Sequence, residues 1–414
     1  MEHLFVVVRE REIELEEMGD DTLDRDARIK LSIGTKHHGE ADGQFSLPRG
    51  LVLDHHRGLL LVADTWVHRV QVFSYDDDGG FSFVSKFGRT RLYYPEGLTI
   101  DHDHDRILIV DTGNHRVQSW SLSDQSFLSC IGKYGSGDLE FNSPQGIAID
   151  KHHRRIIIVD SSNHRLMFLS WIDLSFLFSI GKHGCEPGEF DSPSNIAIDH
   201  DRHRIIVTDT KNHRVQVLSL IDGSFLLEFG SRGNQPCQFD YPLGVCVDNQ
   251  GRIIVADHHN NRLQSFTHEG HHISSFDCGS ESPYAVAFDE HRGLIAFTAG
   301  NRVHVIGANQ WFADTKFVWR PDLHRYAPSS IKQAVMMVTM IRSLVDDCSA
   351  MSMIPNELLF EIFSYLEPPE LEIPLGKYQH QLQQQHRQPD TTTSTATSQH
   401  AASRQRNKKK CTMM

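Results

Sequence analysis

The chain has 414 residues, which is enough for one large domain or two smaller ones. Hydrophobic residues make up 39% and charged residues 23%, and every apolar run is far shorter than the roughly 20 residues of a membrane-spanning helix. The net charge of −13 argues against a surface built throughout for nucleic acid or anionic lipid. This charge is unevenly distributed, because residues 1–28 sum to −6 and residues 375–414 to +6.

The first segment of the chain, residues 1–28, is an acidic leader. Its apolar residues 4–8 are followed at once by acidic ones, without the basic start and long apolar stretch of a secretion signal. The seven cysteines are scattered and form no C-x-x-C pair, so we expect neither a disulfide framework nor a zinc knuckle. We therefore expect a cytoplasmic protein.

A repeat of about 49 residues begins after this leader. A proline followed six residues later by an aspartate occurs six times, at Pro48/Asp54, Pro95/Asp101, Pro144/Asp150, Pro193/Asp199, Pro242/Asp248 and Pro283/Asp289. About ten residues further on, a second aspartate closes an apolar run and precedes an Asn-His-Arg-like element. These second aspartates are Asp64, Asp111, Asp160, Asp209 and Asp257, and we assign Thr298 to this position in the sixth copy.

Each repeat contains four short apolar runs separated by turn residues; in the fourth copy they are 196–198, 205–208, 215–218 and 225–229. The runs are rich in β-branched and aromatic residues and too short for helices, which predicts four antiparallel strands. Six such units predict an all-β, six-bladed β-propeller. The last copy lacks its fourth run, and residues 31–34 can supply that strand from the start of the chain, which closes the ring.

The period, the Pro-x-Gly opening and the Asn-His-Arg-Val-Gln element resemble the NHL-repeat family over about residues 29–308. Asn195 and Ala285 depart from the family pattern, because they replace the opening glycine of their copies. Since glycine readily adopts a left-handed backbone, Asn195 is a mild change and Ala285 puts the geometry of that turn in doubt. The resemblance implies a binding module, either for protein substrates of ubiquitin ligases or for single-stranded RNA.

The 27 histidines follow the repeat, which favours a structural role for most of them. His102 and His104 could chelate zinc, but they lie in a segment that reads as a solvated hairpin tip, so we expect no metal and no cofactor. Related six-bladed rings include lyases and esterases with a metal in the channel. The central residues of the inner strands here are apolar or small, so a channel lyase or hydrolase is a distant alternative and we expect no enzyme.

The loops that leave the outer strands are the candidate partner-binding surface. They begin with basic residues, but acidic residues in the same loops largely cancel the positive field, so we favour a protein partner and keep RNA as the alternative. We also expect the protein to be a monomer. The candidate contacts are Trp66, His115, His164, His213, Lys36, Arg89, Arg91, Lys133, Lys182 and Arg232.

A helical appendage is expected at residues 319–372, after the ring. Residues 354–366 resemble the opening helix of an F-box, the segment through which substrate receptors bind the adaptor of cullin ubiquitin ligases. Pro355 suits the first turn of that helix. Its apolar stripe consists of Leu358, Leu359, Ile362, Phe363 and Leu366. The alternative is a helical hairpin that docks on the ring, because only the first third of an F-box is matched.

The last segment, residues 373–414, is a Gln/Thr-rich basic tail that is expected to be disordered. Cys411 lies four residues from the end, with a terminal methionine and three lysines immediately upstream. This arrangement resembles a CaaX farnesylation box with a polybasic second signal, which implies a peripheral membrane anchor. An accidental cysteine in a basic tail is the alternative. The sequence therefore predicts a partner-recruiting propeller linked to ubiquitin-dependent degradation.

Overall fold

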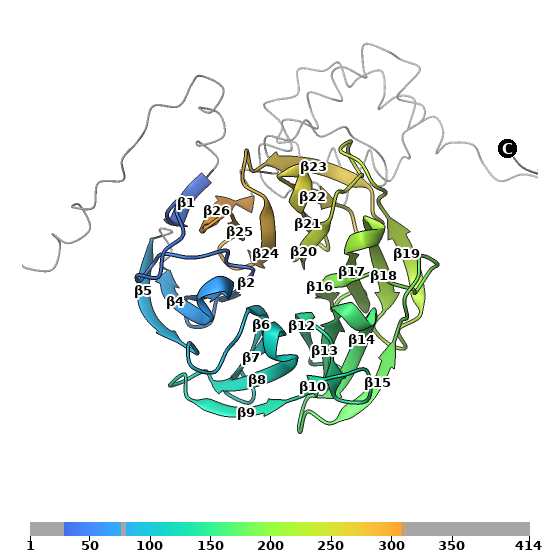
Figure 1. Ribbon diagram of the computed structural model, residues 1–414. Helices are drawn as coiled ribbons and strands as arrows, with labels where there is room; N and C mark the ends of the chain where they lie inside the picture. The colour runs from blue at the N-terminus through green and yellow to red at the C-terminus, as the bar shows by residue number, and fades with distance from the viewer. Residues whose placement is uncertain (1–28, 76–79, 309–310, 312–414) are drawn as a thin grey trace, which may run out of the picture. The chain divides into compact units, whose positions relative to one another are not determined.

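We analysed a computed structural model, which describes residues 29–75, 80–308 and 311. The F-box-like segment and Cys411 lie outside these residues, so both expectations stay predictions. The described chain forms six four-stranded antiparallel sheets around a central opening, and its helices are three-residue 3₁₀ turns (Figure 1). None of the helices in this described part is long and apolar enough to span a membrane. The predicted all-β six-bladed propeller is confirmed.

Each blade is named by its place in the chain, and its strands run from the channel outward. Blade 1 comprises β2 (Gly50–Asp54), β3 (Leu59–Asp64), β4 (Arg69–Tyr75) and β5 (Phe81–Phe87). Blade 2 comprises β6 (Pro95–Asp101), β7 (Arg106–Asp111), β8 (Arg116–Ser121) and β9 (Phe127–Ile131). Blade 3 comprises β12 (Pro144–Asp150), β13 (Arg155–Asp160), β14 (Arg165–Ser170) and β15 (Phe176–Ile180).

The second half of the ring repeats this order. Blade 4 comprises β16 (Pro193–Asp199), β17 (Arg204–Asp209), β18 (Arg214–Ser219) and β19 (Phe225–Phe229). Blade 5 comprises β20 (Pro242–Val247), β21 (Ile253–Asp257), β22 (Arg262–Phe266) and β23 (His272–Asp277). Blade 6 comprises β24 (Pro283–Asp289), β25 (Leu294–Ala299), β26 (Arg302–Gly307) and β1 (Ile29–Gly34). Two further short strands, β10 (Lys133–Tyr134) and β11 (Glu140–Phe141), pair in the loop before blade 3.

The hydrophobic core lies between neighbouring blades. The second strand of a blade is buried on both faces, as β13 shows, whereas the outer strand β15 alternates between half-buried and exposed residues. One core cluster, for example, joins Leu108 of blade 2 to Ile158 of blade 3. Packing against two neighbours explains why the middle strands read as continuous apolar runs.

The ring is closed by the N-terminal strand, as the sequence predicted. Strand β1 pairs antiparallel with β26, with Leu31 opposite Val305 and Ile33 opposite Val303. Ser32 Oγ lies 2.7 Å from His304 Nδ1 and adds a side-chain bond across this pair. The inner strands contact one another around the whole circle, including β24 and β2. Pairing the first and last strands removes the free edge that blade 6 would otherwise expose.

The glycine of the Pro-x-Gly element is required for close approach between blades, and the expected left-handed turn is wrong. None of these glycines has a positive φ, and neither do Asn195 and Ala285. A Cβ on Gly97 would lie 2.2 Å from the Gln145 carbonyl oxygen of the next blade. Ala285 likewise has no positive φ, so the doubt about the geometry of its turn was unfounded.

The alignment of the sixth copy also needs a correction. Pro193 lies opposite Asp209 in blade 4, and the equivalent partner of Pro283 in blade 6 is Ala299. Ala299 therefore occupies the position of the second aspartate, and Thr298 corresponds to Thr208. The turn before Arg302 is two residues shorter than in blade 4, and this length difference caused the misassignment.

Candidate functional site

The ring has two faces with different chemistry. We call the "turn face" the side that carries the 3₁₀ turns η1 (Thr65–Val67), η2 (Thr112–Asn114), η3 (Ser161–Asn163), η4 (Thr210–Asn212) and η5 (His258–Asn260), with the loops between blades. We call the "hairpin face" the opposite side, where the turn after each first aspartate lies. Every predicted partner-binding residue lies in a loop, a strand end or a turn on the turn-face side.

The second aspartate of each repeat organises the turn face. Asp209 is fully buried; its Oδ1 accepts the backbone N–H of Asp191 at 2.7 Å, and its Oδ2 accepts the Nε–H of Arg214 at 2.9 Å. The same Oδ2 accepts bonds from Asn212 and Gln216 at 2.9 and 3.0 Å. Because each donor belongs to a different part of the repeat, this carboxylate holds the interblade loop on its blade. The second aspartates therefore have a structural role.

The repeated histidines fix the junction between blades. His164 adopts a left-handed backbone after η3, and its Nδ1 accepts the N–H of Ser192, just before Pro193, at 3.0 Å. His115 bonds Ser143 at 3.0 Å in the same way. Burial lowers the pKa of His164, and the nearby His183 lowers it further. A neutral imidazole that accepts at Nδ1 is therefore part of the fold, and only its other nitrogen is available to a partner.

Similar bonds occur at other junctions between blades. The Nδ1 of His213 lies 3.3 Å from the N–H of Tyr241, and burial is the main cause that lowers the pKa of His213. In the fifth copy Asn261 takes the left-handed position, and its Oδ1 accepts the hydroxyl of Ser282 at 2.8 Å. Histidine and asparagine both carry a hydrogen-bond acceptor close to the backbone, and both tolerate the left-handed conformation. Asparagine can therefore replace histidine at this position.

Three of the six predicted basic contacts form ion pairs with carboxylates of the loops between blades. Arg89 pairs with Glu40 at 2.6 Å, Lys133 with Glu140 at 3.2 Å and Lys182 with Glu189 at 3.0 Å. Among the other predicted residues, Arg91 stacks on Phe127, Arg232 forms a backbone bridge with Phe239, and the Lys36 carbonyl accepts a bond from Asn301. The charge cancellation expected from the sequence is present as ion pairs.

The turn face carries an aromatic cluster that is partly exposed. Trp66 is 53% exposed, and its ring centroid lies 6.1 Å from that of Tyr94. Tyr93 is 46% exposed and lies 4.8 Å from His68, which in turn lies 4.7 Å from Tyr94. We call Trp66, His68, Tyr93 and Tyr94 the "aromatic patch". The structure thus places Trp66 among other rings, whereas the sequence indicated it alone.

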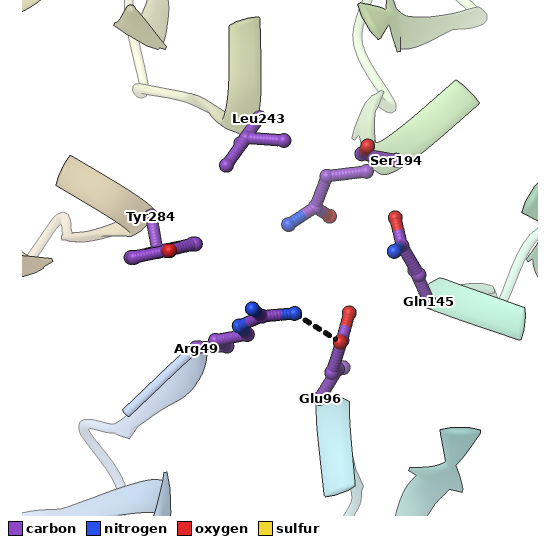
Figure 2. Close-up of a pocket in the computed structure, with 8 residues that line it drawn as sticks. Arg49, Glu96, Gln145, Ser194, Leu243 and Tyr284 are labelled. Carbon is purple, nitrogen blue, oxygen red and sulfur yellow. Dashed lines mark hydrogen bonds and ion pairs between the residues drawn. The ribbon is translucent and has the colours of Figure 1, made fainter. Parts of the chain in front are cut away.

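The mouth of the channel contains residues that the sequence reasoning missed. Each Pro-x-Gly element directs its middle side chain toward the axis, as Figure 2 shows for the residues it labels. These residues are Arg49, Glu96, Gln145, Ser194, Leu243 and Tyr284, together with Asn195. The residue between the proline and the glycine is visible in every repeat, but the prediction rested on the central residues of the inner strands.

One ion pair dominates this mouth. Arg49 donates to Glu96 at 2.9 Å and lies 5.0 Å above the ring of Tyr284. Burial raises the pKa of Glu96, although Arg49 opposes that shift. The mouth can accept a small polar group by hydrogen bonds from its amide, hydroxyl and guanidinium groups. The residues that line this mouth include no histidine or cysteine.

Comparison with known proteins agrees with this architecture. The NHL repeat model matches residues 45–73, 92–119, 190–218 and 239–266. No curated protein sequence matches the chain.

Solved structures with the same fold have low sequence identity. A putative gluconolactonase has a TM-score of 0.51 at 16% identity, with 64% of this chain and 90% of that chain covered. A gluconolactonase from Xanthomonas campestris has a TM-score of 0.50 at 16% identity, with 64% and 87% covered. A protein of unknown function from Bacteroides thetaiotaomicron has a TM-score of 0.50 at 18% identity, with 66% and 73% covered. With the repeat matches and the six sheets, the chain is shown to contain NHL repeats and to fold as a six-bladed NHL-type β-propeller.

Proposed function

We propose that this protein is a non-enzymatic scaffold that binds a segment of a partner protein at the turn face. The exposed aromatic patch supports this proposal, because Trp66 and Tyr93 present large rings to solvent beside ion pairs that cancel charge. Tryptophan and tyrosine contribute much of the binding energy at protein interfaces, since they bury large areas with few rotatable bonds. An extended, apolar segment without a strong negative charge fits such a surface.

Single-stranded RNA is the less favoured ligand. Stacking rings would suit its bases, but a phosphate backbone also needs unpaired positive charge. Lys133 and Lys182 instead pair with carboxylates of their own loops, and Arg89 pairs with Glu40 of the loop before blade 1. RNA binding with an affinity that falls steeply with salt would contradict the proposal of a protein ligand.

A catalytic role for the channel mouth is not part of the proposal. Arg49 and Glu96 neutralise each other there, and the lining lacks the converging imidazole ligands of a catalytic zinc site. The lactonase structures share the fold at 16% identity, and a shared fold does not carry over an activity.

We further propose that the propeller brings its partner to a cullin ubiquitin ligase through residues 354–366, and that Cys411 carries a prenyl group. A pull-down with residues 319–372 tests the first point, and recovery of no cullin adaptor would contradict it. The intact mass of the protein from eukaryotic cells tests the second point. An unmodified and uncleaved C-terminus would rule out prenylation.

The binding proposal is tested by photo-crosslinking in cells, with the wild-type protein and variants that remove exposed rings. Trp66→Ala and Tyr93→Ala should each abolish a protein crosslink. Ile172→Ala is the matched control, because Ile172 is 62% exposed and follows β14 on the hairpin face. Equal loss of the crosslink in the control would show that the aromatic patch has no specific role, and crosslinks to RNA alone would refute the protein ligand.

A further inference from the structure

A group of metal-ligating side chains lies on the hairpin face, away from the aromatic patch and the channel mouth. It consists of His55 from the turn after β2 and of Glu290 and His291 from the turn after β24. One ligand atom of each lies within 4.8 Å of the other two, and the rings of His55 and His291 are 4.2 Å apart between centroids. The two turns belong to blades 1 and 6, so ring closure brings the group together.

The backbone under this group is held by hydrogen bonds to two buried carboxylates, Asp54 and Asp289. Asp54 Oδ1 accepts the N–H of Arg57 at 3.2 Å, and Asp289 Oδ1 accepts the N–H of His291 at 2.9 Å. The hydroxyl of Tyr75 in β4 donates to Asp289 Oδ2 at 2.7 Å. Because Tyr75 belongs to blade 1, this bond fixes the turn of blade 6 against blade 1.

Two imidazoles and one carboxylate form a ligand set that suits zinc and similar ions. Metal–donor distances of about 2.0–2.2 Å require the donors to approach one another by roughly 1 Å, which side-chain rotation at exposed positions allows. Glu290 and His291 are exposed, and His55 is half-buried.

We propose that His55, Glu290 and His291 form a surface site for a divalent transition-metal ion of the zinc class, which links blade 1 to blade 6. Ligands from both sides of the closing junction would resist opening of the ring, since the ion binds only when the two turns are adjacent. This inference is independent of the partner that the turn face binds.

A second group, His164, His183 and Asp191, is a weaker candidate on the turn face. His164 Nδ1 already accepts the N–H of Ser192, so this residue has one nitrogen left for a cation. The group also lies within one junction between consecutive blades. A variant of this second group, His183→Gln, is therefore a suitable control.

The experiment uses the full-length protein after removal of metal with a chelator. Co²⁺ is titrated while visible absorption is recorded, and Zn²⁺ is then added to displace it. We expect one tight equivalent in the wild-type protein and an affinity at least about tenfold lower in His55→Asn and in His291→Gln. The controls are His152→Gln, an exposed histidine on the same face, and His183→Gln in the second group; both should keep the wild-type affinity.

Thermal melting tests the link between blades. Zn²⁺ at about 100 times its Kd should raise the Tm of the wild-type protein by about 5 °C and leave the Tm of His55→Asn unchanged. Wild-type affinity in both His55→Asn and His291→Gln, or loss of binding in His183→Gln, would overturn the site. Tight binding without a rise in Tm would overturn the proposed link.

Discussion

Blades 1–5 and blade 6 use different residues for the same task. In blades 1–5 a buried aspartate at the end of the second strand holds the following arginine; in blade 4 these are Asp209 and Arg214. In blade 6 that strand ends in Ala299, and the carboxylate comes from Glu281 in the preceding loop, which pairs with Arg302 and lies 2.9 Å from His304. The carboxylate thus comes from a different position in the chain but still pairs with the arginine.

This difference shows what each blade requires. A buried arginine needs a carboxylate partner wherever that partner originates, because an unpaired charge in the core is costly. His304 replaces the glutamine found at the equivalent position, Gln216, and links Glu281 on one side to Ser32 of β1 on the other. Hydrogen bonds from His304 and Arg302 lower the pKa of Glu281 to about 2, even though its burial acts in the opposite direction. Blade 6 is therefore adapted to receive the N-terminal strand.

Removal of β1 should have the largest effect on the stability of blade 6. Deletion of residues 1–34 strips β1 from β26 and exposes the core around Ile33 and Val303. We expect the loss of two apolar side chains and a strand ladder to cost at least about 5 kcal/mol and to lower Tm by about 10 °C or more. Deletion of residues 1–28 alone is the control and should melt like the full chain. A similar Tm for both truncations would disprove closure by β1.

The carboxylates of blades 4 and 6 can be compared directly. Asp209→Asn should cost about 3 kcal/mol, because it removes the fully buried counter-charge of Arg214 and leaves only the partly exposed Glu228 at 2.7 Å. Glu281→Gln should cost about 1–3 kcal/mol, since Glu281 and Arg302 are partly exposed and water replaces the lost partner. Chemical denaturation measures both values. Equal costs would show that the relocated carboxylate is as deeply integrated as the original one.

The opening glycine offers a smaller difference between regular blades and blade 6. Gly97→Ala places a Cβ against the Gln145 carbonyl and should cost about 1–3 kcal/mol through overpacking. Ala285→Gly in blade 6 should cost less than about 1 kcal/mol, since it removes one buried methyl group. Urea unfolding of the two variants provides the test. A neutral Gly97→Ala would show that the blades can separate slightly.

Of these changes, acidification should have the smallest effect on stability, because it weakens only the histidine hydrogen bonds between blades. Burial lowers the pKa of His164 and of His213, so the folded state binds fewer protons than the unfolded state below about pH 6.5. Their contribution is complete above about pH 6.5 and is lost as the pH falls through the lowered pKa values. His164→Asn copies Asn261 of blade 5 and should reduce the loss of stability between pH 7 and pH 5. An unchanged pH profile would show that protonation of His164 does not contribute to the loss of stability in acid.

The period of the repeat was sufficient to predict most of the ring. Strand number, blade number and closure by Leu31 and Ile33 follow from alternating apolar runs and turn residues, which are local signals. The role of the glycine in Pro-x-Gly could not be predicted from such local signals. A positive φ and a close contact both favour glycine, and only the distance from Gly97 to the next blade distinguishes them.

The sequence by itself determined the architecture and its repeated bonds, because each repeat carries the same local instructions. Tertiary structure decided which distant residues meet. His55 and His291 become neighbours only when the ring closes, and the pairing of Arg49 with Glu96 depends on the packing of blade 1 against blade 2. Thr298 was assigned to the place of Ala299 for the same reason, because the turn before Arg302 is shorter than in the other blades and only the strand pairing shows which residues are equivalent.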